Sequence, residues 1–148
     1  MASLTLDDIR RIVREARSEN RVPDLSYANL TGMDLSGMDL SHANLRVADL
    51  SGANLFNANL RDADLTGANL IDADLRGANL RGANLRLADL RGVNLSDANL
   101  FFSNLRGANL RGVNLRSAYL RGAVLTDADL SDADLTDAIG AAVESRKK

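Results

Sequence analysis

Four Asp-Ala-Asp triplets are the residues of this chain whose type and spacing could most directly support chemistry. They lie at 62–64, 72–74, 127–129 and 132–134. Paired carboxylates can hold a hard cation or share acid–base work. The same pairs also arise whenever a short repeat carries Asp at two outward positions, and the glycine-rich calcium-binding nonapeptide is absent from the sequence. We therefore interpret the triplets as surface residues and expect neither a metal site nor a catalytic one.

The remaining chemical inventory is narrow. The 148 residues include no cysteine and one histidine, His42, which excludes disulfides, thiolate zinc sites, cysteine nucleophiles and histidine-centred triads. His42 has no second ligand in the pattern, and we expect it to be solvated, with no cofactor and no small-molecule substrate. Acids at Asp7 and Asp8 stand where a secretory signal would have its apolar core, and the longest uncharged stretch, Leu50 to Leu60, is too short to span a bilayer. These features predict a cytoplasmic protein that does not cross a membrane.

A strict repeat must position whatever this chain uses for function. Leucine occupies every fifth position from Leu25 to Leu135, preceded by Asn or Asp except at Tyr119 and Val124, and a small or apolar residue lies two positions before each leucine. A period of five fits neither a helix nor a strand. A coil that turns a corner every five residues would bury each leucine and the residue two before it. The sequence predicts a core ladder of Leu25, Leu45, Leu65, Leu85, Leu105 and Leu125.

The size of the coil is indicated by the charges that precede the leucines. Pairs of aspartates at these positions are separated by five, ten, fifteen or 25 residues, but never by twenty. Like charges stacked at about 4.8 Å repel each other, so residues twenty apart are predicted to be stacked neighbours. Four pentads then form one coil, in which each Asp lies on an Asn that can donate to its carboxylate.

The unit A-(D/N)-L-x-x resembles the pentapeptide-repeat protein family, and the resemblance extends from Ala28 to Ala138. It implies an all-β solenoid, a right-handed quadrilateral β-helix, here of about six coils and about 28 Å in length. It also implies a functional candidate. Some members act as DNA mimics that bind DNA gyrase or topoisomerase IV and protect it from quinolones or toxins.

The two ends of the rod need covering, because bare coils expose apolar surface and unpaired backbone. We predict an N-terminal capping helix within residues 1–22, a β-helix over 23–138, and a short C-terminal cap with a frayed basic tail over 139–148. Thr5 and Asp8 have the spacing of a capping box. A C-terminal cap or homodimer patch is predicted at Tyr119, Val124, Ile139 and Val143.

Charge divides the surface into three zones. Residues 24–74 and 122–137 are acidic, whereas 76–121 carry eight arginines and two acids. This basic belt is a candidate docking surface for an acidic partner, although a solvated polar face is the simpler interpretation because no aromatic row accompanies it. The belt consists of Arg76, Arg81, Arg86, Arg91, Arg106, Arg111, Arg116 and Arg121.

A second candidate surface consists of apolar residues at outward positions. Exposed aromatic residues often anchor interfaces, but scattered surface apolars explain the pattern equally well. The set comprises Tyr27, Val47 and Leu87, which occupy equivalent sites, together with Phe56, Ile71, Phe101 and Phe102.

These observations favour a non-enzymatic scaffold that binds an unidentified protein partner, as a monomer or a C-terminal homodimer. A DNA mimic that binds a type II topoisomerase ranks second, because about 28 Å of duplex carries about 16 charges, whereas the repeat region carries 15 acids and 10 arginines. We do not expect direct nucleic-acid binding. A third interpretation is a consensus-like repeat with no evolved partner, against which Phe56, Ile71 and Phe101 argue.

Overall fold

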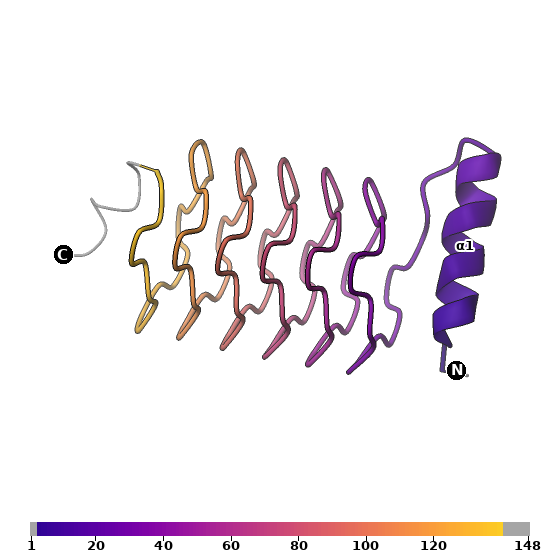
Figure 1. The fold of residues 1–148 in the computed structure, drawn as a ribbon, viewed down its shortest axis with the longest axis horizontal. Coiled ribbons are helices and arrows are strands. Elements are labelled where there is room, and N and C mark those ends of the chain that lie inside the picture. Colours follow the sequence, from indigo (N-terminus) through magenta and orange to yellow (C-terminus); the bar gives the residue numbers. More distant parts are fainter. Residues whose placement is uncertain (1–2, 141–148) are drawn as a thin grey trace.

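A single helix lies across one end of a stack of coils in the computed structural model, which describes residues 3–140 (Figure 1). Helix α1, Leu6–Ser18, begins at Thr5, whose side chain accepts a hydrogen bond from the Asp8 backbone N–H at 3.1 Å. The Asp8 carboxylate in turn accepts from the Thr5 N–H at 2.8 Å. This reciprocal capping box, predicted from the sequence, satisfies backbone donors that would otherwise lack partners.

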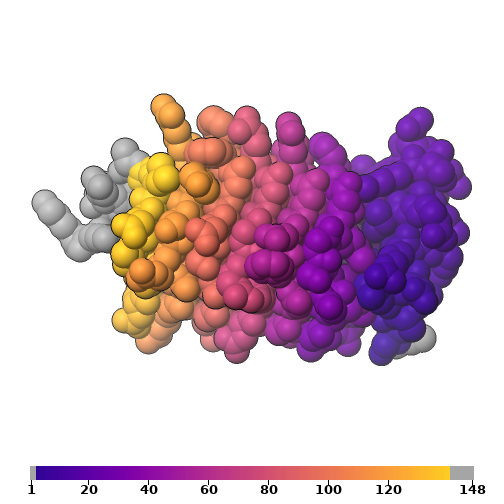
Figure 2. All heavy atoms as spheres, viewed as in Figure 1, coloured from indigo at the N-terminus to yellow at the C-terminus, as the bar shows by residue number. Residues whose placement is uncertain are grey.

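The coils are held together by isolated parallel β-bridges rather than by long strands. Each bridge in the described part of the chain joins residues twenty apart, from Asp24 with Asn44 to Tyr119 with Ile139. The spacing is the one that the charge pattern indicates. No two aspartates are bridge partners within residues 3–140, so each stacked carboxylate has a neutral neighbour. Figure 2 shows the coils as successive bands along the rod.

Each coil turns a corner after every leucine. In the first repeat the Ala28 N–H donates to the Leu25 carbonyl at 3.2 Å, and the intervening Tyr27 has a φ of 60°. The same i to i+3 bond and positive φ recur in the repeats that follow. A positive φ at the third residue is the mark of a type II turn, which favours glycine or asparagine. Five large side chains nevertheless occupy this position: Tyr27, His42, Val47, Leu87 and Phe102.

Leucines and the residues two before them fill the interior. The predicted core ladder is buried from Leu25 to Leu125. The buried Ser103 satisfies its hydroxyl by donating to the Leu100 carbonyl at 2.8 Å. At the helical end Ile9, Val13 and Ala16 of α1 are buried, whereas Leu130 and Leu135 in the last coil are only partly buried.

The residue before each leucine shapes the corner that follows. Where this residue is Asn or Asp, its side-chain oxygen accepts a hydrogen bond from the backbone N–H two residues on, as from Ser26 to Asp24 at 3.0 Å and from Arg86 to Asn84 at 3.1 Å. These bonds are Asx turns, for which Asn and Asp are the preferred residues. The predicted bond from an Asn to the Asp stacked on it also forms between coils, for instance from Asn44 Nδ2 to Asp24 at 3.2 Å.

Candidate functional site

The residues with potential for catalysis lie apart on the surface. Within residues 3–140 no three His, Asp or Glu side chains gather in a way that could hold a metal ion. His42 Nε2 lies 3.9 Å from a carboxylate oxygen of Asp62, and Arg61 forms an ion pair with the same carboxylate at 3.3 Å. The Asp62 carboxylate is therefore engaged by neighbouring side chains, and the Asp64 carboxylate accepts a hydrogen bond from the Thr66 N–H of its own turn at 3.0 Å. Over the same range the structure contains no helix with the length and apolar character needed to cross a membrane.

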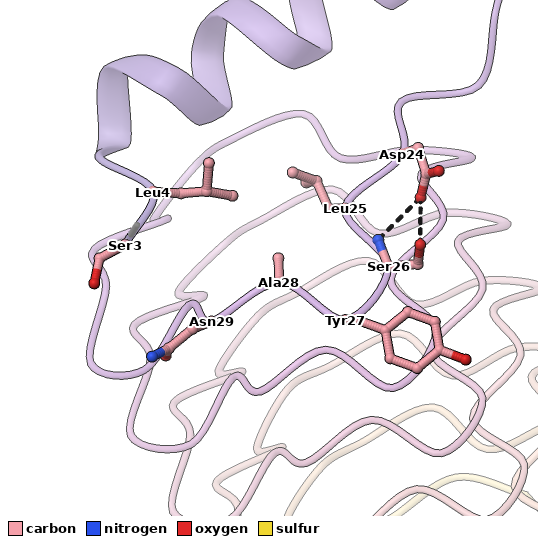
Figure 3. Close-up of a pocket in the computed structure, with 8 residues that line it drawn as sticks. All are labelled: Ser3, Leu4, Asp24, Leu25, Ser26, Tyr27, Ala28 and Asn29. Carbon is pink, nitrogen blue, oxygen red and sulfur yellow. Dashed lines mark hydrogen bonds between the residues drawn. The ribbon is translucent and has the colours of Figure 1, made fainter. Parts of the chain in front are cut away.

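A small pocket lies between the start of the chain and the first coil. Its volume is about 240 Å³, and Leu4, Leu25 and Ala28 contribute apolar surface to it (Figure 3). The Asp24 carboxylate at its edge accepts hydrogen bonds from the Ser26 hydroxyl and N–H, at 2.6 and 3.0 Å, which hold the pKa of Asp24 below its usual value. Small-molecule sites are usually larger, at about 300–1,000 Å³. The pocket is therefore smaller than a typical small-molecule site, and its Asp24 carboxylate is engaged by Ser26.

The arginines of the basic belt differ sharply in their partners. Arg76 and Arg91 each form a two-pronged ion pair, with Asp74 and Asp89 respectively, at 2.7 Å. These guanidinium groups lower the pKa of both carboxyls. Arg106, Arg111 and Arg116 lie 3.5–3.9 Å from carboxylates of the C-terminal acidic zone.

Three belt arginines keep their charge uncompensated. Within residues 3–140, Arg81, Arg86 and Arg121 have no carboxylate in ion-pair distance. The belt is thus largely neutralised by its neighbours. In the described part of the belt a partner would meet free positive charge at these three positions, of which Arg81 and Arg121 share one corner of the rod.

That corner also carries three aromatic rings. We call residues 79–84, 99–104 and 119–124 the aromatic corner, because three successive coils turn there. The ring of Phe101 lies 6.4 Å from that of Phe102 and 5.7 Å from that of Tyr119, centroid to centroid. The guanidinium carbon of Arg81 lies 5.3 Å from the Phe102 centroid, a cation–π distance. The structure therefore brings together belt arginines and aromatics that the sequence analysis treated as separate surfaces.

The other predicted apolar residues lie on different corners. Tyr27, Val47 and Leu87 are exposed at equivalent turns, as predicted, with Gly67 in the coil between Val47 and Leu87. Phe56 packs beneath the Arg76 guanidinium at 5.3 Å. Ile71 is half-buried and has no ring contact. These residues do not merge with the aromatic corner.

The predicted C-terminal patch overlaps the aromatic corner. Tyr119 and Val124 belong to both and are 40% and 43% exposed, and Ile139 of the next coil forms a β-bridge with Tyr119. Val143 lies outside the described residues, as does the basic tail. Self-capping of this end and pairing with a second copy both stay predictions.

The contact between Tyr119 and Phe101 escaped the sequence analysis, although the signal was present. Tyr119 lies twenty residues after Asn99, and Asn99 precedes Phe101 by two. The twenty-residue register alone therefore places the Tyr119 ring one coil above the Phe101 corner. The orientation of Arg81 over Phe102 depends on side-chain rotamers and carries no such signal.

The sequence matches the model of one known protein family. The model described as pentapeptide repeats matches in eight copies, over residues 24–62, 58–97 and 103–139. No curated protein is similar enough to count as a relative.

Solved structures of pentapeptide repeat proteins resemble the chain. A protein of the Arabidopsis thaliana thylakoid lumen is 37% identical, with a TM-score of 0.55 over 74% of this chain and 69% of its own. Rfr23 from the cyanobacterium Cyanothece 51142 is 26% identical, with a TM-score of 0.66 over 93% of this chain and 100% of its own. QnrB1, a plasmid-mediated fluoroquinolone resistance protein, is 22% identical over 82% of this chain and 79% of its own, with a TM-score of 0.42.

Proposed function

This chain belongs to the pentapeptide repeat family, and from that premise we propose that it is a non-enzymatic scaffold whose rigid rod presents fixed side chains to a protein partner. The family fold is the right-handed quadrilateral β-helix, and its members are generally structural rather than catalytic. Capping by α1, a length of about six coils and a cytoplasmic location belong to the same proposal.

The observation that carries the proposal is a set of large apolar side chains held outward at strained positions. Tyr27, Val47, Leu87 and Phe102 are each 48–67% exposed and have φ between 56° and 60°. Bulky residues avoid this backbone region, which costs about 1–2 kcal/mol for a residue with a Cβ. Exposed side chains recover little of that cost through burial. Such strain is typical of sites selected for contact rather than for folding.

The scaffold provides what an interaction surface needs, which is rigidity. Each coil is bonded to the next through backbone hydrogen bonds of 2.7–3.2 Å on all four sides, as from the Leu45 N–H to the Asp64 carbonyl at 2.7 Å. Side chains at the corners therefore keep fixed separations along the rod. A surface that is already ordered loses less entropy on binding than a mobile loop.

Binding to a type II topoisomerase is the second candidate, and it rests on the family resemblance alone. The arginine-rich zone from Arg76 to Arg121 interrupts the acidic surface that a duplex mimic would need. A consensus-like rod without a partner is the third candidate, and the strained apolar residues argue against it.

The test is a binding experiment with the full chain. Proteins captured on the immobilised chain are identified, purified and titrated against it by calorimetry. The comparison is with a variant in which Tyr27, Val47, Leu87 and Phe102 are all replaced by glycine. We expect a saturable complex that this variant loses while its circular dichroism spectrum is retained. Absence of any saturable protein ligand, or equal binding by the variant, would refute the proposal as argued.

A further inference from the structure

We propose that the aromatic corner binds a short acidic peptide segment of a partner protein, with an apolar side chain of that segment seated against Phe101, Phe102 and Tyr119. This inference rests on the proposed function and adds to it the surface used and the chemistry of the partner. Three independent observations support it: the ring cluster, the local charge and the backbone at Phe102.

The ring cluster offers an apolar anchor point at the surface. Phe102 is 60% exposed, and its neighbours Tyr119 and Val124 are exposed where other coils carry Asn or Asp. Phe101 is half-buried and contacts both other rings, so it holds them in one group. Aromatic residues and arginine are the side chains that most often dominate binding energy at protein interfaces.

Charge selects an acidic partner. The three segments of the aromatic corner contain no Asp or Glu and two arginines, Arg81 and Arg121. Neither has a carboxylate within ion-pair distance in the described part of the chain. By contrast, the corner arginines Arg76 and Arg91 are each occupied by an aspartate of their own repeat. Carboxylates of a partner would therefore find bidentate donors available on both sides of the rings.

Phe102 places a large side chain at a turn position whose backbone conformation favours glycine. Its φ is 57°, and the equivalent residues of the coils before and after it are Gly82 and Gly122. The ring leans over Gly122, where an added Cβ would lie 2.5 Å from the Phe102 Cδ1 atom. The glycine therefore leaves room for the ring. The backbone of Phe102 is strained, its ring is exposed, and Gly122 leaves space for the ring. These features together point to contact with another molecule.

The extent of the surface limits the ligand to a short segment. On the N-terminal side the acid-free zone ends at Asp62, which lies against Gly82. The next acid along the chain after Val124 is Asp127, at the following corner. Three coils at about 4.8 Å spacing match about four residues of an extended peptide. Nucleic acid is disfavoured, because its phosphate backbone requires a continuous basic track and acidic zones interrupt any such track here.

The experiment uses the intact chain as bait for a displayed library of random twelve-residue peptides. We expect enriched peptides in which two or more acids flank one aromatic or aliphatic residue. A synthesised, fluorescein-labelled member is then titrated by anisotropy, alongside the same peptide with its acids replaced by amides and alongside labelled oligo-dT. Binding should weaken about tenfold or more for the amide peptide, which is the size of a typical hot-spot loss.

Matched variants locate the site. Phe102→Gly and Arg121→Gln should each weaken binding about tenfold. Phe102→Gly should not lower the melting temperature, because it relieves an unfavourable φ. Two control variants should bind as well as the parent: Val22→Gly removes an exposed apolar side chain outside the aromatic corner, and Arg14→Gln removes an exposed arginine of helix α1.

The outcomes separate this inference from the proposed function. Peptide binders insensitive to Phe102→Gly and Arg121→Gln, no acidic consensus, or preferred binding of oligo-dT would each overturn the inference. If those two variants still bind the protein captured on the immobilised chain, the scaffold role stands, but the aromatic corner is not the surface that binds this protein. If no protein ligand exists at all, the proposed function fails first.

Discussion

A single residue in this fold can work against stability, and Val47 is the clearest case. Its φ of 56° is unfavourable for a β-branched side chain, and the side chain is 48% exposed. Val47→Gly should raise the free energy of unfolding by about 0.5–1 kcal/mol, because relief of the positive φ exceeds the entropy that glycine adds to the unfolded chain. Thermal unfolding followed by circular dichroism measures the change.

Val22→Gly is the matched control for Val47→Gly. Val22 is 57% exposed but does not have a positive φ. The substitution should lower the free energy of unfolding by about 0.5–1 kcal/mol, through glycine entropy alone. Equal destabilisation by the two variants would mean that the backbone at Val47 is not strained.

At this scale the sequence could predict burial but not backbone cost. The inward positions follow from the five-residue period, and Ala43 and Leu45 are buried accordingly. The role of Asn and Asp was only partly predictable. The absence of Asp pairs twenty apart does reflect stacking, but most of these side chains bond to the backbone of their own turn, as Asn69 does to the Ile71 N–H at 3.1 Å. That bond depends on φ, ψ and the side-chain rotamer, which cannot be predicted by counting charges.

At the scale of elements, helix α1 is fixed to the rod by the side chain of Arg17 as well as by its apolar face. Arg17 donates from Nη1 to the Asp39 carboxylate at 2.8 Å and from Nη2 to the Asp39 carbonyl at 3.0 Å. Chiefly because of the Arg17 hydrogen bond, the pKa of Asp39 falls from 3.8 to about 2. Asp39 therefore links the first coil to the helix across its end.

Arg17→Gln should lower the free energy of unfolding at pH 7 by about 0.5–1 kcal/mol, since the pair is partly exposed and screened by solvent. The Asp39 pKa is lowered on folding, so its contribution is present above about pH 3.8 and is lost as pH falls through about 2. The difference between parent and variant should thus shrink below pH 2 to the part that comes from the Arg17 bond to the Asp39 carbonyl, which does not titrate. Arg14→Gln, on the same helix, is the control and should behave as the parent. A difference of the same size at pH 7 and below pH 2 would contradict this account.

The existence and start of α1 could be predicted, whereas its attachment could not. The helix start is predicted by the three-residue spacing of Thr5 and Asp8, which is that of a capping box. Its apolar face consists of Ile9, Val13 and Ala16. The Arg17 to Asp39 contact joins residues 22 apart across two different elements. It depends on the angle at which the helix crosses the coil, which a repeat pattern does not encode.

On the scale of the whole molecule, aspartates bonded in their own turns give the rod a common response to acid. Hydroxyl and backbone hydrogen bonds lower the pKa of Asp24, Asp49, Asp129 and Asp134. Because these values are lowered on folding, stability is full above about pH 4 and falls as pH decreases further. The melting temperature should be level from pH 5 to 8 and drop below pH 4. The drop should persist at high salt, which screens charge repulsion but does not restore the hydrogen bonds. A level melting temperature down to pH 2 would contradict this.

The charge along the whole rod differs from that of duplex DNA, so we do not expect the chain to act on DNA gyrase. A duplex presents negative charge along its full length, at about one charge per 1.7 Å. This rod is acidic only at its two ends, and five of the eight arginines in between are engaged by carboxylates in the described residues. A protein surface that binds DNA would therefore meet arginine–aspartate ion pairs along the middle of the rod. At the aromatic corner it would meet unpaired positive charge. Gyrase supercoiling, with or without a quinolone, should be unchanged across a wide range of protein concentrations. Inhibition or rescue at micromolar protein, abolished by neutralising Asp49 and Asp64, would establish the topoisomerase role and show that local charge geometry outweighs net charge.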